Sequence, residues 1–505
     1  MVARKEQGIG KMVEHSQSPN RTMEDSKPDY IPEDDAQLQR MGHKPELQRN
    51  FSTLSMLGLA FAVLNSWTAL SASLSISLTS GGSTSVIWGL VTAGVCNLCI
   101  ATSLAEFLSA YPTTCLMCYI TALEANTTGW LIALVATNAL LSSQLIVGIV
   151  SAVYPDFVWQ RWQQFLIYVG YTLLAFVVNA FMNSVLPIIY RGAFTWSIGG
   201  FVLVSITVLA CASPDYNTAY FVFCDFVNQT GWPDGVAWLL GLLQGGLGVT
   251  AFDAVAHMIE EIPQPSIRGP KIMVTCVAIG TFTGAIFLMV LLFVAGDINK
   301  VVNSSAGPLL QILLHATNNT AGGICLLMLP LVCLVFATLS VMTTSSRMIF
   351  AFARDGGLPA SRIFCRVHPK LKLPLNGLLL TSFVVIIFGL IYLGSTSAFN
   401  AIISSSVVAL DLSYAMPIAV NCLRGRKTLP DRKWRLPAIF GWIVDIISLS
   451  YIALTTVLFL FPPGRPVTGS SMNYCIVAFA IIVVVSVVQW IVDGRKNFTG
   501  PKVEH

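Results

Sequence analysis

The stretch FSTLSMLGLAFAVLNSWTALSASLSI, residues 51–76, contains no Asp, Glu, Lys or Arg. A helix that crosses the hydrocarbon core of a bilayer needs about 20 predominantly apolar residues, and this stretch is long enough. Polar side chains interrupt it near its middle, at Asn65-Ser66-Trp67-Thr68. Because unpaired polar groups are costly in lipid, this interruption predicts a functional break in a membrane-spanning helix.

Eleven further apolar stretches follow, and each is long enough to cross a bilayer as a helix. We expect them at residues 86–109, 130–152, 165–182, 193–211, 236–258, 272–295, 324–341, 375–393, 398–420, 438–460 and 474–492. Only 11% of the 505 residues are charged, whereas soluble domains carry roughly 25%. The sequence therefore predicts an all-α integral membrane protein with about 12 transmembrane helices.

Basic residues are distributed unequally between the two sides of this predicted domain. With the N-terminus in the cytosol and the segments alternating in direction, 18 of the 29 Lys and Arg fall in inner loops and the C-terminal tail. Only Arg161, Lys300 and Arg465 fall in outer loops, none falls inside a span, and the N-terminal tail holds the rest. Cytosolic loops of membrane proteins are enriched in Lys and Arg, so we expect both termini to be cytosolic.

The chain divides into one membrane domain and two tails. Residues 1–50 are polar, without an apolar core, which is typical of a disordered cytosolic tail. We expect residues 51–492 to form the transmembrane domain and residues 493–505 a short cytosolic tail. The sequons at Asn228, Asn303 and Asn318 fall in expected outer loops, where glycans can be attached, although other sequons fall on the inner side. The plasma membrane is the expected location, with a vacuolar membrane as the alternative.

The sequence contains no constellation for metal or enzyme chemistry. The pairs Cys96-x-x-Cys99 and Cys115-x-x-Cys118 each have the spacing of half a zinc site, but no nearby His or further pair completes one. No His pair with ligand spacing lies within a span, which also argues against a membrane enzyme. The net charge of +4 is explained by membrane topology. We therefore expect no metal, no cofactor and no nucleic acid, with the lipid bilayer as the main surrounding.

The sixth segment contains a second candidate break. Gly241, Gly245, Gly246 and Gly248 precede the sequence Val249-Thr250-Ala251-Phe252-Asp253, and we expect these glycines to loosen the helix just before an acid. The first and sixth spans correspond if the core consists of two five-helix halves, and broken helices at such positions mark the binding sites of secondary transporters. The alternative is that Gly and Ser simply let neighbouring helices pack closely.

Asp253 and Asp411 are the acids nearest to this expected site, and Asp411 lies about halfway through the tenth span. Acids inside membranes are costly and mark proton, ion or substrate pathways. Asp253 either contacts substrate or a proton, or it orders the inner half-helix. Asp411 either carries a proton or pairs with a cationic substrate, or it is a protonated acid bonded to Ser413 or a neighbouring helix. We interpret His257 and Asp445, nearer the cytosolic ends, as structural.

Four motifs carry a resemblance to a known family. MIFAFARDGGLP at residues 348–359 closely resembles the loop after the eighth span of amino acid–polyamine–organocation permeases. SAYPT at residues 109–113, preceded by Glu106, resembles the segment after the second span. TAFDAVAH at residues 250–257 and LAFAVLNSWTAL at residues 59–70 are similar to the sixth-span and first-span segments of the fungal amino acid/choline branch. The resemblance runs from about residue 51 to residue 492.

This resemblance implies a leucine-transporter-like permease domain with a 5+5 inverted-repeat core, two further C-terminal helices and alternating access. By position it implies a substrate site lined by Asn65, Ser66, Trp67 and Thr68 from the first span and by Thr250, Ala251, Phe252 and Asp253 from the sixth. Two departures stand out. The branch usually has Gly where Ala251 stands, and the fifth span lacks the Lys with which some members occupy a cation site. The coupling ion therefore does not carry over.

The expected substrate is a small amine-bearing solute. A quaternary ammonium is best held by aromatic faces, for which Trp67 and Phe252 are candidates and Tyr414 is a weaker one. A primary amine would bind carbonyl oxygens or a carboxylate, and its acid end would bind a helix N-terminus. We expect a proton-driven or facilitative importer of choline or of a small amino compound such as 4-aminobutyrate, with Asp411 and Asp253 as coupling candidates. The alternatives are a non-transporting substrate sensor and a metabolite exporter of the same fold.

Overall fold

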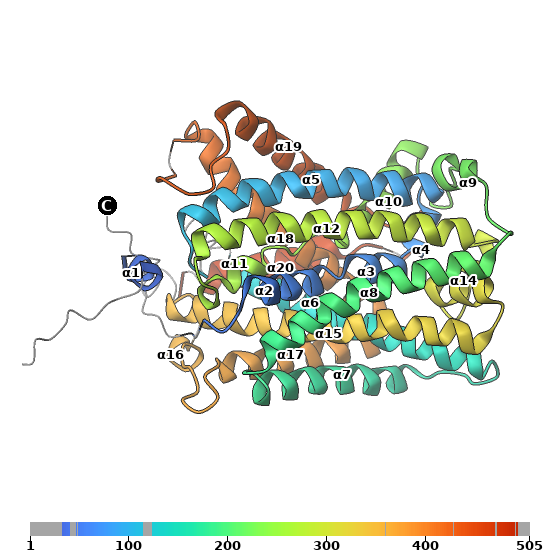
Figure 1. Ribbon diagram of the computed structural model, residues 1–505, viewed down its shortest axis with the longest axis horizontal. Helices are drawn as coiled ribbons and strands as arrows, with labels where there is room; N and C mark the ends of the chain where they lie inside the picture. The colour runs from blue at the N-terminus through green and yellow to red at the C-terminus, as the bar shows by residue number, and fades with distance from the viewer. Residues whose placement is uncertain are drawn as a thin grey trace, which may run out of the picture.

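The computed structural model describes residues 33–40, 47, 49–114, 124–358, 360–427, 429–469, 472–489 and 491–492. The elements in these ranges are helices, and Ser80 and Asn228 form an isolated β-bridge. The expected all-α class is confirmed. The long helices run side by side along the longest axis of the molecule (Figure 1).

The helices have the following bounds: α1 (Glu33–Arg40), α2 (Thr53–Leu64), α3 (Ser66–Ala72), α4 (Ser75–Thr79), α5 (Gly82–Ala110), α6 (Glu124–Val153), α7 (Arg161–Phe181), α8 (Leu186–Ala212), α9 (Ala219–Cys224), α10 (Asp234–Leu247), α11 (Ala254–His257), a 3-10 turn η1 (Ile259–Glu261), α12 (Pro265–Val294), α13 (Ile298–Val302), α14 (Pro308–Thr317), α15 (Thr320–Arg354), α16 (Ser361–Phe364), α17 (Leu375–Gly394), α18 (Thr396–Leu423), α19 (Ala438–Leu458) and α20 (Cys475–Gln489).

Ten stretches in the described part of the chain are long and apolar enough to cross a membrane: α2 with α3, α5, α6, α7, α8, α12, α15, α17, α18 and α19. They coincide with ten of the expected segments. At the sixth position the helix is divided into α10 and α11, and at the twelfth position α20 is shorter than a full span. The protein is therefore a multi-pass membrane protein, and the count of twelve and the inverted repeat stay predictions.

The structure corrects two expectations: the position of one basic residue, Arg347, and the disorder of the whole N-terminal tail. The eighth segment was expected to end at residue 341, but α15 continues to Arg354, so Arg347 lies buried on a helix rather than in a loop. In this part of the helix Arg347 has a buried acidic partner, Glu261. Within the tail that we expected to be disordered, residues 33–40 form α1, with Leu38 buried and the Asp34 carboxylate bonded to the backbone of Gln264. Residues 1–32 and 493–505 lie outside the described residues.

The apolar core consists of two clusters that meet halfway along the bundle. One cluster contains α2 up to Leu64 and α12 up to Val277, and the other contains α3 from Trp67 and α12 from Ala285. We call the end where α2 begins and α15 finishes the Arg347 end, and the opposite end, with α13 and α14, the Asn303 end. The change from one cluster to the other marks the middle of the bundle, between Leu64 and Trp67 on the first span.

Two of the α10 glycines serve helix packing rather than loosening. A Cβ at Gly245 would lie 2.7 Å from the Cα of Leu90 on α5, and a Cβ at Gly241 would lie 2.5 Å from the Oγ of Ser85 on the same helix. The helix remains intact through both glycines and ends only at Leu247. For Gly241 and Gly245 the packing alternative is therefore correct, because close approach of α5 requires a residue without a side chain.

Candidate functional site

The first-span break is built on one residue with left-handed backbone geometry. Asn65 has φ 45° and ψ 37°, a region that Asn tolerates better than most residues. Its N–H donates to Phe61 at the end of α2, and its carbonyl accepts from Ala69 at the start of α3. The Thr68 hydroxyl bonds to the carbonyl oxygen of Asn65, at 3.0 Å, and to its side-chain oxygen. The polar sequence Asn65-Ser66-Trp67-Thr68 thus forms a specific break in the first span, as expected.

The sixth-span break spans residues 248–253. Between α10 and α11, Ala251 has φ 68°, a conformation that costs a residue with a Cβ about 1–2 kcal/mol. Gly, which the resemblance implies at this position, would adopt this conformation freely. Both the break and its position just before Asp253 agree with the prediction.

The two breaks lie at the same depth and face one another. On the Asn303 side, the Gln244 side chain donates a 2.7 Å hydrogen bond to the carbonyl of Leu70. Gly248 packs directly against the Leu70 side chain. On the Arg347 side, α11 packs against α2. Each half of the first span is therefore paired with the corresponding half of the sixth.

Several buried polar atoms at these breaks have no hydrogen-bond partner within the described part of the chain. They are the side-chain nitrogen of Asn65 and the hydroxyl oxygens of Ser66 and Thr250. Each of the three residues is less than 10% exposed. Most buried polar groups in proteins are satisfied, and leaving one unsatisfied costs about 1–3 kcal/mol. Their gathering at the breaks therefore indicates that something else supplies their partners.

The structure brings Phe252, Asp253 and Tyr414 together. The Tyr414 hydroxyl, on α18, donates a 2.6 Å hydrogen bond to Oδ1 of Asp253, and its ring stacks on Phe252 at 5.2 Å. His257 places Nε2 3.1 Å from Oδ2 of the same acid. All four side chains are buried. His257, which we interpreted only as structural, is therefore a direct partner of the candidate acid.

Trp67 occupies a different apolar cluster from Phe252. Its Nε1 donates a 2.9 Å hydrogen bond to Ser197 on α8, and its ring meets Phe287 edge-on at 4.9 Å. Phe252 packs in the cluster toward the Arg347 end, whereas Trp67 packs in the cluster toward the Asn303 end. The two candidate aromatic faces therefore do not form one enclosure in this conformation.

Asp411 faces a neighbouring helix. The Thr455 hydroxyl on α19 donates a 3.0 Å hydrogen bond to Oδ2 of Asp411, while Ser413 bonds instead to the backbone of Leu410. Of the structural alternatives considered for Asp411, the geometry matches a bond to a neighbouring helix and not to Ser413. Tyr414 lies on the same helix, close to one turn further on.

Two buried ion pairs close the Arg347 end next to the sixth-span break. Arg347 pairs with Glu261 at 3.0 Å, and Arg354 holds Glu260 through two hydrogen bonds of 3.0 and 3.1 Å. Burial alone would raise the pKa of Glu260, but Arg354 and hydrogen bonds from Thr114 outweigh it and lower this pKa to about 2. From the sequence Arg347 was expected in an inner loop, and its pair with Glu261 was therefore not predicted. The two consecutive acids after the sixth span, Glu260 and Glu261, were a sequence signal that could have indicated such pairs.

A second charged cluster joins α5 to the segment between α18 and α19. Glu106 accepts hydrogen bonds from Arg426, from Arg432 at 2.9 Å and from the backbone of Leu436 at 2.7 Å. Arg426 also bonds to Asp445. The sequence marked Glu106 only as part of a motif and Arg426 only as an inner charge, so this network was not predicted.

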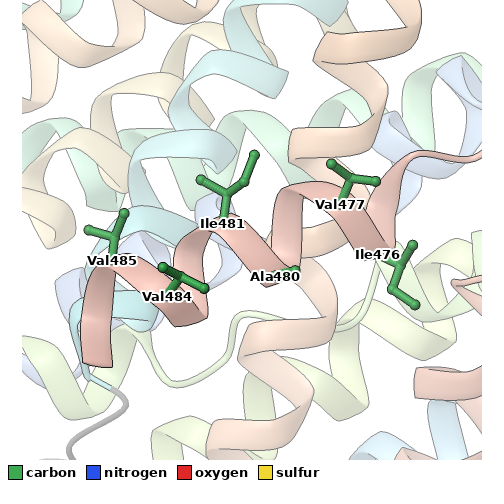
Figure 2. Close-up of a pocket in the computed structure, with 6 residues that line it drawn as sticks. All are labelled: Ile476, Val477, Ala480, Ile481, Val484 and Val485. Atoms are coloured by element: carbon green, nitrogen blue, oxygen red, sulfur yellow. The ribbon is translucent and has the colours of Figure 1, made fainter. Parts of the chain in front are cut away.

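A surface pocket lies away from both breaks. Six apolar residues of α20 line it, as Figure 2 shows: Ile476, Val477, Ala480, Ile481, Val484 and Val485. Apart from Ala480, more than half of each of these side chains is exposed. An exposed apolar stripe on an outer helix of a membrane protein is suited to face lipid. This pocket is therefore not part of the candidate site.

Comparison with known proteins identifies the class of molecule to which this architecture belongs. A family model described as amino acid permease matches residues 51–486. A choline transporter of Saccharomyces cerevisiae is 31% identical over 473 residues, covering 90% of this chain and 83% of the relative. A putative amino acid/polyamine transporter of Macrophomina phaseolina is 33% identical over 441 residues, covering 83% and 96%. An amino-acid permease of Arabidopsis thaliana is 28% identical over 496 residues, covering 92% and 95%.

With its broken first and sixth spans, the protein is a membrane permease for small solutes. The chain belongs to the amino acid permease family, within the amino acid–polyamine–organocation superfamily. The resemblance drawn from the four sequence motifs is confirmed.

Proposed function

We propose that the protein is a secondary active transporter that moves choline, or a small amino compound such as 4-aminobutyrate, by alternating access. The observation that carries this proposal is the pairing of two helix breaks at which three buried polar atoms have no partner among the described residues: Asn65 Nδ2, Ser66 Oγ and Thr250 Oγ1. Discontinuous helices near mid-membrane bind solutes through such freed groups. A solute bound between the breaks would satisfy all three atoms.

The remaining candidate residues shape this site. Thr68 holds the left-handed turn at Asn65, and Ala251 forms the corresponding turn of the sixth span. Trp67 anchors α3 to α8 through Ser197. Phe252, Asp253 and Tyr414 form the wall toward the Arg347 end.

The polar groups at the breaks favour a solute with a hydroxyl or carboxylate opposite its amine. One amide NH2 group and two hydroxyls can bind either a hydroxyl or a carboxylate; choline carries a hydroxyl and 4-aminobutyrate a carboxylate. The relatives named choline transporter and amino acid/polyamine transporter support both substrate classes. In this conformation Phe287 meets the Trp67 ring, so cation–π binding of choline at Trp67 would require ring movement.

Orientation follows from the distribution of charge. The Arg347 end carries Arg347, Arg354, Arg426 and Arg432, whereas the sequons at Asn303 and Asn318 lie at the opposite end. The positive-inside rule supports a cytosolic Arg347 end and an outer Asn303 end. On this basis we place both termini in the cytosol, and we keep the plasma membrane as the proposed location, with a vacuolar membrane as the alternative.

Alternating access in this proposal uses the two breaks as hinges. On the cytosolic side α2 and α11 lie below the breaks, and on the outer side α3 and α10 lie above them. A solute that contacts both halves binds the closed arrangement best and thereby shifts the equilibrium between outward-open and inward-open states. Direction is then set by the gradients.

Uptake of labelled choline and labelled 4-aminobutyrate by yeast lacking its own carriers tests the proposal. Thr250→Val removes a free hydroxyl at the break, and uptake should fall. Thr172→Val is the matched control, because the Thr172 hydroxyl is also buried but bonds to its own helix α7 at Tyr168. Uptake of neither solute, with the protein shown at the cell surface, would contradict the proposal and favour a sensor or an exporter.

A further inference from the structure

We infer that Asp253, His257 and Tyr414 together form a proton-binding site through which a pH gradient drives transport, an inference that rests on the transport function proposed above. Asp253 is fully buried, and Tyr414 and His257 bond to its two oxygens at 2.6 and 3.1 Å. The second ring nitrogen of His257, Nδ1, is buried and has no hydrogen-bond partner among the described residues. His257 lies four residues after Asp253, so the ring that contacts the buried acid also carries a basic nitrogen with no partner among the described residues.

The charge balance around Asp253 makes this group responsive to protons. Within the part of the chain that the structure describes, no Lys or Arg pairs with Asp253, and His257 is its one basic partner. A buried carboxylate without a compensating cation is strongly disfavoured. With a neutral His257 the pair carries one negative charge, and with one added proton it is neutral. Binding of one proton therefore changes the helix break from a charged to an uncharged state.

Within the described ranges, neighbouring elements supply no competing positive charge to the pair. From α18 the titratable group that contacts the pair is Tyr414, which in turn lies near Asp411, and from α12 the facing group is Cys276. Helix α2 contributes no titratable side chain. Toward the Arg347 end, Glu261 and Glu260 of η1 are already paired with Arg347 and Arg354 of α15. These arginines are therefore engaged, and the proton remains the available counter-charge.

The proton step involves one bond at one atom. In the neutral ring, Nε2–H donates to Asp253, and the lone pair on Nδ1 accepts a proton from water entering on the open side, forming an N–H bond. The resulting imidazolium and the carboxylate form a neutral pair, which lowers the cost of enclosing the break in a dehydrated state. When the break opens to the other side, the N–H bond breaks, the electron pair stays on Nδ1 and the proton passes to water.

Asp411, the other coupling candidate, has a different environment. Its nearest recorded partner is a Thr455 hydroxyl on α19, and no basic side chain pairs with it among the described residues. Asp253, by contrast, has the imidazole of His257 against its carboxylate. The inference therefore places proton coupling on the Asp253 group rather than on Asp411.

Purified full-length protein in liposomes separates transport from coupling. Counterflow of labelled choline, with labelled 4-aminobutyrate in parallel, is measured at equal pH on both sides. Uptake is then measured with a pH of about 5.5 outside and about 7.5 inside. We expect the gradient to stimulate wild-type uptake and His257→Gln to lose this stimulation while counterflow remains detectable. His315→Gln, the control at an exposed His, should keep both.

Two further variants keep the inference testable if His257→Gln does not fold. Tyr414→Phe removes one donor from the carboxylate, so the pH midpoint of gradient-driven uptake should move upward, and Asp411→Asn should retain stimulation. Given counterflow in wild type, two results would overturn the inference. In the first, the pH gradient still stimulates uptake by His257→Gln. In the second, only Asp411→Asn loses this stimulation. Absence of wild-type counterflow for both solutes would instead reject the transport function itself. If His257→Gln loses counterflow as well as stimulation, the test rests on Tyr414→Phe. An unchanged pH midpoint of gradient-driven uptake in Tyr414→Phe then overturns the inference.

Discussion

Arg347 on α15 and Glu261 at the end of the sixth span form a buried ion pair, with 3.0 Å between Nε and Oε1. Arg347 also donates a 2.9 Å hydrogen bond to Asn183, which lies just before α8, and the backbone N–H of Phe51 donates to the Glu261 carbonyl. One pair thus connects the starts of the first and fifth spans with the ends of the sixth and eighth. It lies where the Arg347 end must open if the solute is to leave on that side.

Removing one partner of this pair should be costly. Arg347→Ala leaves the Glu261 carboxylate buried and unpaired, so we expect a loss of about 3–5 kcal/mol in stability and a lower melting temperature. Melting of purified protein in detergent, followed by tryptophan fluorescence, measures this loss. Arg191→Ala is the control, because Arg191 is exposed and bonds only to its own helix. Equal melting temperatures of the two variants would contradict a stabilising role for the pair.

The strained backbone at Ala251 predicts an unusual response to glycine. Ala251→Gly relieves a φ of 68° and should raise stability by about 1 kcal/mol. Three residues away, Ala254 lies in the helix α11, where Gly is unfavourable by about 0.5–1 kcal/mol. Ala254→Gly should therefore lower the melting temperature. The same direction of change in both variants would show that the Ala251 turn is not strained.

The sequence predicted the breaks because their signals are local. A polar Asn in an apolar helix and a run of Gly before Thr250 are visible within a few residues. The partners are not local, since Tyr414 lies 161 positions from Asp253 and Ser197 lies 130 from Trp67. Only tertiary packing decides which of many aromatic side chains reaches the break.

Charge counting failed for a related physical reason. Lys and Arg mark the inner side of a membrane protein, and the counting rule therefore assigned Arg347 to a loop. An Arg can instead lie within a helix when an acid from another helix neutralises it, as Glu261 does here. Neither the length of α15 nor the network around Glu106 follows from local hydropathy, because both depend on partners distant in sequence.

The carboxyl of Asp355 should make stability depend on pH. Burial, with the nearby Glu260 charge, outweighs Arg354 and raises the pKa of Asp355 to about 6. A carboxyl whose pKa is raised in the folded state costs stability when it ionises, so this cost appears as pH rises from about 4 to about 6. Glu260, with its pKa at about 2, stays ionised throughout that range.

Asp355→Asn cannot ionise, so the variant should gain stability over wild type as pH rises. The gain at pH 7.5 should be on the order of 2 kcal/mol, falling toward zero near pH 4. Melting temperatures of both proteins across this range test the expectation. Asp215→Asn is the matched control, because it removes a carboxylate at an exposed position. A constant difference between Asp355→Asn and wild type would contradict the raised pKa.

Glycosylation tests the proposed orientation. Asn303 and Asn318 are exposed at the Asn303 end, whereas both N–H groups of Asn228 are used, in bonds to Trp232 at 2.7 Å and Asp234 at 2.9 Å. We expect glycans at Asn303 and Asn318 but not at Asn228. In a eukaryotic host, the Asn→Gln variants of the first two should each migrate faster before deglycosylation. Protein without any glycan, or with glycan on inner sequons alone, would argue against the orientation.

Counterflow by the purified Asn65→Asp variant in liposomes tests the central claim most directly, because this substitution replaces the free amide donor at the first-span break by an acceptor. We predict that wild type and Thr172→Val exchange labelled solute saturably. Asn65→Asp should lose exchange of 4-aminobutyrate, whose carboxylate it repels, and should keep exchange of choline. A substrate site at the two helix breaks would be contradicted by one result. In that result wild type, Asn65→Asp and Thr250→Val all exchange the same solute, choline or 4-aminobutyrate, at the same rate.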